Sequence, residues 1–328
     1  MGRAADGDEI VQARGWPRVG RPIPLRRVLN LASDVGWLHW GARAFTRSNR
    51  VDVWFSPANV LPFHLARPMV ASILDTNVLD VAGSYDRAYT AYANRMFASA
   101  ARRASIVLTI SEASRVNISD RFGIAPDKIV VAYPGIDHAI STRSAAHPLA
   151  LPGRFALFVG QTEPHKNLPR LVAAWAQDIP NDLHLVLAGP AGRDEEPIRQ
   201  AIGDSRARER IHRVGRVSDD VLATLYEDAT CFVFPSIAEG FGMPPLEAMA
   251  RGVPTAVSSV PALVEVTRGG ALVFDPYDVE SIASAVRTLA SDSDERERLR
   301  KAGPEVAKAY RWSDTAATVW NTIRALLE

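Results

Sequence analysis

The chain of 328 residues has little of several features that mark specialised protein classes. It has one cysteine, Cys231, so no disulfide can form within it, and the apolar segment around this residue is typical of a buried strand. No apolar run approaches the roughly 18 residues of a membrane span, and the first 20 residues lack the apolar centre of a signal peptide. A net charge of +1 gives no global field for nucleic acid. These absences favour a cytoplasmic protein without nucleic acid among its partners.

Lysine is also scarce, because only four of the 38 basic residues are lysines. Each lysine therefore draws attention, and Lys166 follows an apolar segment and a glycine. Hydrophobic and charged contents of 47% and 23% are those of a soluble globular protein, and the length suggests two domains.

From residue 155 onward, short apolar segments alternate with helical patterns. We expect strands at 155–160, 183–189, 211–214, 230–234, 254–257 and 271–274, and helices at 167–177, 194–202, 218–228, 245–251 and 278–290. Such alternation predicts a doubly wound parallel sheet, which binds ligands at the carboxyl ends of its strands.

The N-terminal half predicts a second, smaller α/β unit. Its expected strands are 51–56, 69–74, 105–110 and 128–133, with a helix over 85–103 and another capped by Ser111. A segment rich in Ser, Ala, Pro and Gly follows, which is typical of a linker. We therefore expect an N-terminal domain over 1–138, a linker over 139–153, a C-terminal domain over 154–312, and a last helix over 313–328 that packs back across the domains.

Residues 25–45 form a candidate amphipathic helix with arginines around its apolar face and Trp37 and Trp40 nearby. Two interpretations stay open. The helix could make peripheral contact with the inner face of a membrane, or it could pack on the sheet of the N-terminal domain.

The most informative stretch is 235–254, PSIAEGFGMPPLEAMARGVP. It places Glu239 and Glu247 on either side of a glycine-flanked Phe241 and a double proline, directly after an apolar strand. A strand, a glycine-rich loop and a helix N-terminus form an anion site, because free N–H groups and the positive end of the helix dipole face one place. Carboxylates beside it suit hydroxyl groups. The stretch therefore predicts a site for a nucleotide sugar.

Three segments resemble glycosyltransferase family four, the retaining GT-B glycosyltransferases. They are EGFGMPPLE at 239–247, VGQTEPHKN at 159–167 and the segment 214–236. The resemblance is close over 105–328 and weaker over 51–104. It implies two Rossmann-like domains facing a cleft, with the donor on the C-terminal domain and the acceptor on the N-terminal one.

The resemblance also implies roles for individual residues. Glu239 would contact the donor sugar at the reacting centre, Lys166 would neutralise the leaving diphosphate, and Glu247 would hydrogen-bond the ribose. Further donor contacts are implied at Gly160, Val217, Gly240, Phe241, Gly242, Met243 and Leu246, mostly through backbone N–H groups. No cofactor or metal is expected, because a lysine and a helix end can supply the positive charge. The one Asp-x-Asp, at 292–294, is expected to cap a helix instead.

The chain also departs from the family pattern. Only about 50 residues precede the first expected strand, so we expect a shortened N-terminal domain or a start that lies too late. Leu74-Asp75 stands where the family often has His-Asp, which leaves Asp75 and Ser111 as acceptor-side candidates and suggests a donor such as a 6-deoxy sugar. Members of the family often add an arginine to the phosphate lysine. In this chain the neighbours are Gln161 and His165, of which His165 could supply partial charge.

Two functions remain in competition. The leading hypothesis is a retaining, metal-independent transferase that moves a hexose or 6-deoxyhexose to a glycan, lipid-linked or natural-product acceptor. The alternative is a non-catalytic nucleotide-binding subunit that supports a partner transferase. Glycan phosphorolysis is disfavoured, because nothing marks a lysine for a covalently bound cofactor. In the leading hypothesis the domains close over the substrates, with the linker as the hinge.

Overall fold

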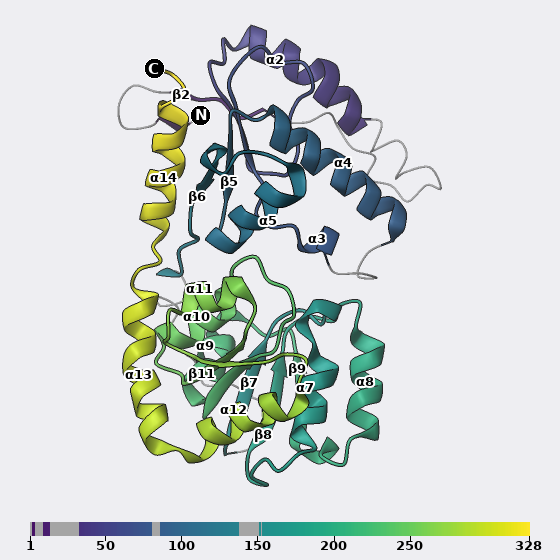
Figure 1. Cartoon of the computed structure of the whole chain (residues 1–328), viewed down its shortest axis with the longest axis vertical. Coiled ribbons are helices and arrows are strands. Elements are labelled where there is room, and N and C mark those ends of the chain that lie inside the picture. The colour runs from purple at the N-terminus through teal and green to yellow at the C-terminus, as the bar shows by residue number, and fades with distance from the viewer. Residues whose placement is uncertain (1, 4–8, 14–32, 81–85, 138–150, 152) are drawn as a thin grey trace.

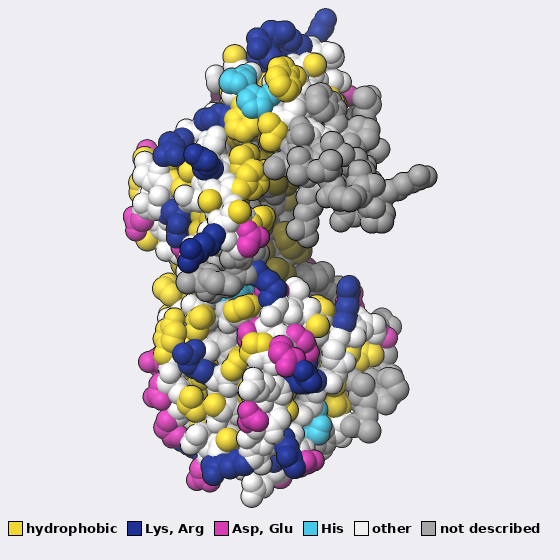
Figure 2. Space-filling model, turned by 90° about the vertical axis from the view of Figure 1, so that its right-hand side faces the viewer, with side chains coloured by type: hydrophobic (Ala, Val, Ile, Leu, Met, Phe, Trp, Pro, Cys, Tyr) yellow, Lys and Arg dark blue, Asp and Glu magenta, His cyan; other side chains and the backbone are white. Residues whose placement is uncertain are grey.

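The structure is a computed structural model that describes residues 2–3, 9–13, 33–80, 86–137, 151 and 153–328. Within these ranges the chain forms two α/β lobes, each built on a parallel sheet (Figure 1). The space-filling view shows the two lobes meeting at a narrower waist (Figure 2).

The elements follow in chain order. The N-terminal lobe contains β1 (Gly2–Arg3), β2 (Glu9–Ile10), the π-helix η1 (Trp37–Gly41), α2 (Ala42–Ser48), β3 (Trp54–Ser56), β4 (Met69–Ser72), α3 (Asn77–Asp80), α4 (Arg87–Arg103), β5 (Ile106–Thr109), α5 (Glu112–Phe122), η2 (Pro126–Lys128) and β6 (Ile129–Val131). The C-terminal lobe contains β7 (Phe155–Val159), η3 (Pro164–Lys166), α7 (Leu168–Trp175), β8 (His184–Ala188), α8 (Glu195–Asp204), η4 (Arg208–Arg210), β9 (Ile211–Gly215), α9 (Asp219–Asp228), β10 (Cys231–Phe234), α10 (Met243–Ala250), β11 (Thr255–Ser258), α11 (Pro261–Thr267), β12 (Leu272–Phe274), α12 (Val279–Ser291) and α13 (Ser293–Ala307). The last helix is α14 (Trp312–Arg324).

The C-terminal sheet has the strand order β12-β11-β10-β7-β8-β9. Numbered from the start of this lobe, that order is 3-2-1-4-5-6, the doubly wound arrangement of dinucleotide-binding domains. The order reverses between β7 and β10, so the loops after these two strands diverge and leave room for a ligand. The predicted fold is therefore confirmed, and it identifies the place to look for a site.

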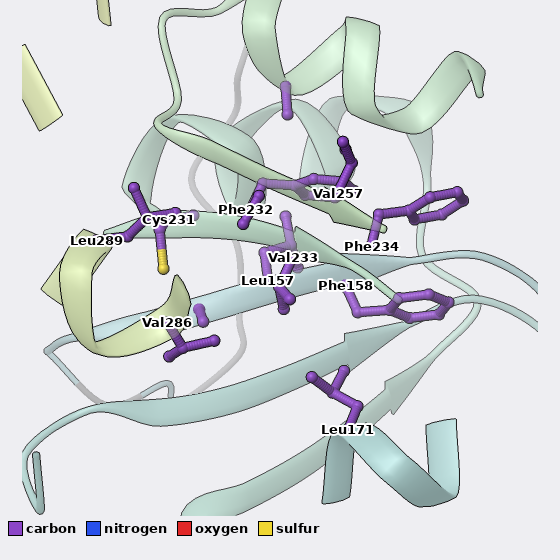
Figure 3. Close-up of a cluster of buried hydrophobic side chains, with 14 of the residues drawn as sticks. Leu157, Phe158, Leu171, Cys231, Phe232, Val233, Phe234, Val257, Val286 and Leu289 are labelled. Carbon is purple, nitrogen blue, oxygen red and sulfur yellow. The ribbon is translucent and has the colours of Figure 1, made fainter. Parts of the chain in front are cut away.

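Apolar side chains on both faces of its strands form the core of this lobe. Every residue of β10 is buried, and Figure 3 shows how its side chains interleave with those of neighbouring elements. The rings of Phe158 and Phe234 stack with centroids 5.7 Å apart. Cys231 is a core residue as predicted, and burial raises the pKa of its thiol to about 12.

Four side-chain helix caps were predicted from the sequence, and three of them form in the structure. Ser111 caps α5 by accepting from Ser114 N at 3.0 Å, and Asp278 caps α12 by accepting from Glu280 N at 3.0 Å. Asp292 accepts from two N–H groups of α13, which confirms the capping interpretation of the Asp-x-Asp. Ser218 occupies the N-cap position of α9 as predicted, but its hydroxyl bonds the Asp220 carboxylate and not a helix N–H, so the expected side-chain cap does not form.

The N-terminal lobe has shorter strands than the sequence predicts. The strand expected over 51–56 is reduced to β3, and the described sheet has four strands in the order β3-β4-β5-β6. In the other lobe, α10 begins at Met243, ahead of the prolines, and α11 occupies a segment for which no helix was predicted.

Of the stretch 25–45, residues 25–32 lie outside the described part of the chain. The remainder packs on the N-terminal lobe: Leu38 O accepts from Phe63 N at 2.9 Å, and the His39 ring stacks on Phe63 at 4.4 Å. Packing on this lobe, the second interpretation, therefore holds for the described residues. Trp40 nevertheless stays 68% exposed.

The C-terminal helix α14 runs along the N-terminal lobe (Figure 1). Trp312 N donates to Asp137 Oδ2 at 2.8 Å, and Thr315 Oγ1 donates to the carbonyl of Tyr133. The lobes are thus tied by the end of the chain. The linker predicted over 139–153 lies outside the described residues except at 151 and 153, so its hinge role stays a prediction.

Candidate active site

Two charged side chains meet at the point where the strand order reverses. Lys166 ends η3 after β7, and Glu239 lies in the loop after β10. Lys166 Nζ lies 2.6 Å from Glu239 Oε1, and the two side chains are only 14% and 11% exposed. The ammonium also lies 4.8 Å from the centre of the Phe234 ring. Because of this partial burial, the pair acts on a ligand with less screening than a surface pair.

Hydrogen bonds of the backbone and of one side-chain amide hold these loops together. His165 O accepts from Ile237 N at 2.8 Å, which joins the β7 loop to the β10 loop. Asn167 Nδ2 donates to Pro235 O at 3.0 Å and to Pro276 O at 2.8 Å. Asn167 is buried and has a positive φ of 59°, a conformation that asparagine tolerates better than most residues. No role was predicted for Asn167, because both of its partners lie in loops that are far away in the sequence.

The N-terminus of α10 faces this region, and glycine is required there. Gly242 has a φ of 109°, and a Cβ on it would lie 2.4 Å from Leu263 Cδ2. The N–H groups of Gly242 and Met243 lie ahead of the first hydrogen bond within the helix. The two prolines that follow have no N–H group that would need a partner. Leu246 N donates to Gly242 O at 3.5 Å, so this N–H group makes a hydrogen bond within the first turn of the helix.

Phe241 contributes to this terminus only through its backbone. Its side chain is 3% exposed and packs against Tyr310 and Tyr133, with ring centroids 5.5 and 6.3 Å away. The backbone role predicted for Phe241 is therefore compatible with the packing of its ring.

Gly160 lies where two loops approach each other. Its N–H donates to Ala188 O at 2.9 Å, and a Cβ on Gly189 would lie 2.1 Å from Gly160 O. Val217 lies farther along the same edge, after β9, where it packs partly buried on the core.

Glu247 lies one turn into α10 and contacts a buried tyrosine. Tyr226 Oη donates to Glu247 Oε2 at 3.0 Å. Burial raises the pKa of Tyr226 well above its usual value, and the nearby Glu247 carboxylate adds to the effect. The hydroxyl therefore stays protonated and donates. Tyr226 was missed because a tyrosine in an apolar helix pattern reads as core.

The N-terminal lobe brings Asp75 against the same loop. A Cβ on Gly240 would lie 2.6 Å from both Cβ and Oδ2 of Asp75, so the two lobes touch here. Burial raises the pKa of Asp75, Glu239 raises it further, and the Asn77 N–H and Lys166 oppose this effect. The structure thus unites Asp75, Gly240, Glu239 and Lys166.

The two remaining N-terminal candidates differ in their surroundings. Leu74, next to Asp75, is 47% exposed. The Ser111 hydroxyl is buried and donates to Gly240 O at 2.7 Å, across the contact between the lobes. A direct acceptor contact by Ser111 stays a prediction.

His165 lies in surroundings that disfavour a positive charge on its ring. Burial lowers the pKa of His165, and the adjacent Lys166 lowers it further. A lowered pKa favours the neutral imidazole, so the surroundings of His165 do not support the partial charge predicted for it. Gln161 donates to Ala191 O at 3.4 Å and carries no charge.

The described residues contain no group of three or more His, Cys, Asp or Glu side chains that could hold a metal ion. None of the helices in these same ranges is long and apolar enough to cross a bilayer.

The arrangement suits the departure of an anionic group. A cation and a helix N-terminus converge at one edge of the sheet, with carboxylates beside them. Preorganised donors of this kind stabilise charge that develops on a leaving phosphate, and carboxylates accept from hydroxyl groups. Two Rossmann-like lobes with such a site between them define a GT-B glycosyltransferase.

The comparison with protein families agrees. Residues 3–140 match the family described as Glycosyltransferase Family 4, and residues 141–306 match Glycosyl transferases group 1. The chain belongs to this family of glycosyltransferases.

Individual relatives support the same class. The chain is 30% identical over 315 residues to O-antigen chain mannosyltransferase B of Escherichia coli, covering 92% of this chain and 82% of the relative. It is also 30% identical to the serotype-specific mannosyltransferase WbdA of Escherichia coli, covering 69% of this chain and 29% of that longer protein.

Solved structures share the fold. Sucrose-phosphate synthase of Thermosynechococcus elongatus superposes with a TM-score of 0.75 at 20% identity, over 93% of this chain and 80% of the other. HepE of Anabaena, in complex with UDP and glucose, superposes with a TM-score of 0.72 at 20% identity, over 92% and 83%.

Proposed function

We propose that this glycosyltransferase moves a hexose or 6-deoxyhexose from a nucleoside-diphosphate sugar to a glycan, lipid-linked or natural-product acceptor. Transfer proceeds with retention of the anomeric configuration and without a metal ion or other cofactor. One observation carries the proposal: Lys166 and Glu239 form a partly buried pair at the reversal of the strand order, facing Asp75 of the other lobe. The relative named as an O-antigen chain mannosyltransferase supports a hexose donor and a glycan acceptor.

The roles follow the geometry. The diphosphate lies at Lys166 and the N-terminus of α10, where the positive charge is. Glu239 contacts the sugar, and Glu247, with Tyr226 behind it, accepts from the ribose hydroxyls. The acceptor enters from the side of Asp75.

The direct test is turnover of a donor panel. Purified protein is incubated with UDP-, GDP-, dTDP- and ADP-sugars in the presence of EDTA, and NMR identifies the anomer of the product. We expect transfer or donor hydrolysis in EDTA with retention, abolished by Glu239→Ala. Nucleotide binding without turnover for any donor would instead favour the non-catalytic subunit, and an inverted product would contradict the mechanism.

Leu74 is expected to influence the choice of donor. An apolar side chain leaves a polar group of the sugar without a partner, so the wild type should prefer a 6-deoxy sugar over its 6-hydroxylated counterpart. Leu74→His should shift kcat/KM toward the 6-hydroxylated donor by about tenfold, and Leu74→Met serves as the apolar control. GDP-D-rhamnose (the 6-deoxy form of mannose) and GDP-mannose, or dTDP-6-deoxyglucose and dTDP-glucose, provide the comparison, because each pair differs only in the 6-hydroxyl group. A wild-type preference for the 6-hydroxylated sugar would show that the idea is wrong.

Tyr226→Phe is expected to weaken donor binding. The substitution removes one hydrogen bond to a carboxylate, so KM should rise about tenfold while kcat changes less than twofold. The effect should shrink for a 2′,3′-dideoxy nucleotide, which lacks the hydroxyls that Glu247 accepts from. Tyr310→Phe removes the hydroxyl of another buried tyrosine, which donates to Val266 O at 2.9 Å, and controls for stability. An equal effect on ribose and dideoxyribose nucleotides would contradict the assignment.

Peripheral contact with an anionic membrane is a second element of the proposal. It is supported by exposed Trp40, 68% accessible, and by the exposed arginines Arg43, Arg47 and Arg50 along and beside α2, at the end of the N-terminal lobe (Figure 1). Sedimentation with vesicles of anionic and of zwitterionic lipid tests it. Retention only on anionic vesicles, lost in Trp40→Ser, is expected, and absence from both pellets would contradict the contact.

A further inference from the structure

The N-terminus of α5 is capped by a side chain from the other lobe. Glu265 lies on α11 of the C-terminal lobe and accepts from Glu112 N and Ala113 N, each at 2.8 Å. These are the first two N–H groups of α5, which its own helix cannot satisfy. Ser114 N, the third, is satisfied by Ser111 within the N-terminal lobe.

The carboxylate has a third partner from the N-terminal lobe. Tyr133 Oη donates to Glu265 Oε1 at 2.9 Å, and the Tyr133 backbone in turn accepts from Thr315 on α14. Burial and the hydrogen bond to Glu265 raise the pKa of Tyr133, so its hydroxyl remains a donor. Three donors of one lobe thus converge on one half-buried anion of the other, and a charged hydrogen bond is stronger than a neutral one.

The same helix end also holds the loop of the candidate active site. Ser111 Oγ donates to Gly240 O at 2.7 Å, and Ser114 Oγ donates to the same carbonyl at 3.2 Å. Gly240 directly follows Glu239, which pairs with Lys166. A displacement of α5 from the C-terminal lobe would therefore remove two hydroxyl groups from the loop that carries Glu239.

We propose that Glu265 is a positioning residue for glycosyl transfer: by capping α5 across the lobes it docks the helix whose Ser111 and Ser114 hold the Glu239 loop. This inference rests on the proposed transfer reaction. Glu265 itself contacts neither substrate. It sets the position of α5, and α5 sets the position of the loop.

The test compares Glu265→Gln with the wild type in the full chain. The amide of glutamine can accept hydrogen bonds on one atom only, so one charged hydrogen bond is lost. We therefore expect kcat to fall about tenfold, while the affinity for UDP and GDP changes less than twofold. Small-angle scattering with nucleotide bound should show a larger radius of gyration for the variant. Glu112→Gln is the matched control, because its carboxylate pairs with Arg115 at the same helix end and makes no bond across the lobes.

Each other outcome has a meaning. An unchanged kcat with unchanged compactness overturns the proposal. A fall in nucleotide affinity by the same factor as kcat, together with a lower melting temperature, also overturns it, because Glu265 would then act only through the fold of its own lobe. If the wild type transfers no sugar, the proposed function fails, while scattering still decides whether Glu265 docks the lobes.

Discussion

Lys166→Met should reduce kcat for sugar transfer by about 10²–10³-fold, a loss typical of removing one preorganised donor to a developing charge. Lys166 Nζ is the cation at the reversal of the strand order, and no other side chain of the described β7 loop replaces it, since Gln161 is uncharged and burial lowers the pKa of His165. Methionine keeps the length and apolar volume of the stem, so the packing against Phe234 is preserved. Steady-state kinetics with saturating donor measures the effect.

Two further variants separate catalysis from stability in this prediction. Lys166→Met leaves the Glu239 carboxylate, 11% exposed, without its cation, which destabilises the protein by about 1–3 kcal/mol. Lys166→Met/Glu239→Gln should recover the melting temperature without recovering activity. Lys301→Met removes an exposed lysine paired with Glu297 at 3.1 Å and should change neither quantity. Turnover within threefold of the wild type for Lys166→Met would contradict the assignment of this residue.

Gly240→Ala should nearly abolish transfer while leaving nucleotide binding intact. The added Cβ would lie 2.6 Å from Cβ and Oδ2 of Asp75, a distance that real Cβ atoms do not adopt. Because Asp75 belongs to the other lobe, the strain can be relieved by parting the lobes, and the C-terminal lobe need not unfold. We expect kcat to fall at least 100-fold, since a small misplacement of reacting groups costs about this factor. The affinity for UDP and GDP, measured by calorimetry, should change less than threefold.

A size-matched comparison sharpens this expectation. Gly203→Ala places a methyl group in α8 where nothing lies within 4 Å, so it should leave activity unchanged and raise stability slightly. Gly240→Ala/Asp75→Gly removes the clash and should restore the radius of gyration seen by scattering. Normal activity in Gly240→Ala would show that the lobes do not need this contact during transfer.

Much of the fold could be predicted because its signals are local. The alternation of apolar segments and helices after residue 155 predicted a parallel sheet. Three helix starts were predicted from their capping residues, Ser111, Asp278 and Asp292, and the structure contains them. Ser218 failed as a cap because its hydroxyl has a nearer partner in Asp220. Strand 51–56 was overextended because its first half, VDV, alternates like a strand but pairs with no strand of the described sheet.

The candidate site could be predicted in composition but not in geometry. Glu239, Lys166 and Glu247 were identified from motifs, yet nothing local indicated that Tyr226 bonds Glu247 or that Asn167 joins three loops. The lowered pKa of His165 could not be predicted for the same reason, since the burial that causes it depends on packing.

The sequence by itself determined the chemistry of the loop around Gly240 and Gly242: a strand, a positive-φ glycine and a helix start, all set by neighbours in the chain. Only the tertiary structure decided which groups meet. Lys166 and Glu239 are 73 residues apart, and Glu265 lies 153 residues from the N–H group of Glu112 that it caps. Such contacts form only when the strand order and the docking of both lobes are complete, because they depend on positions in space that no short segment specifies.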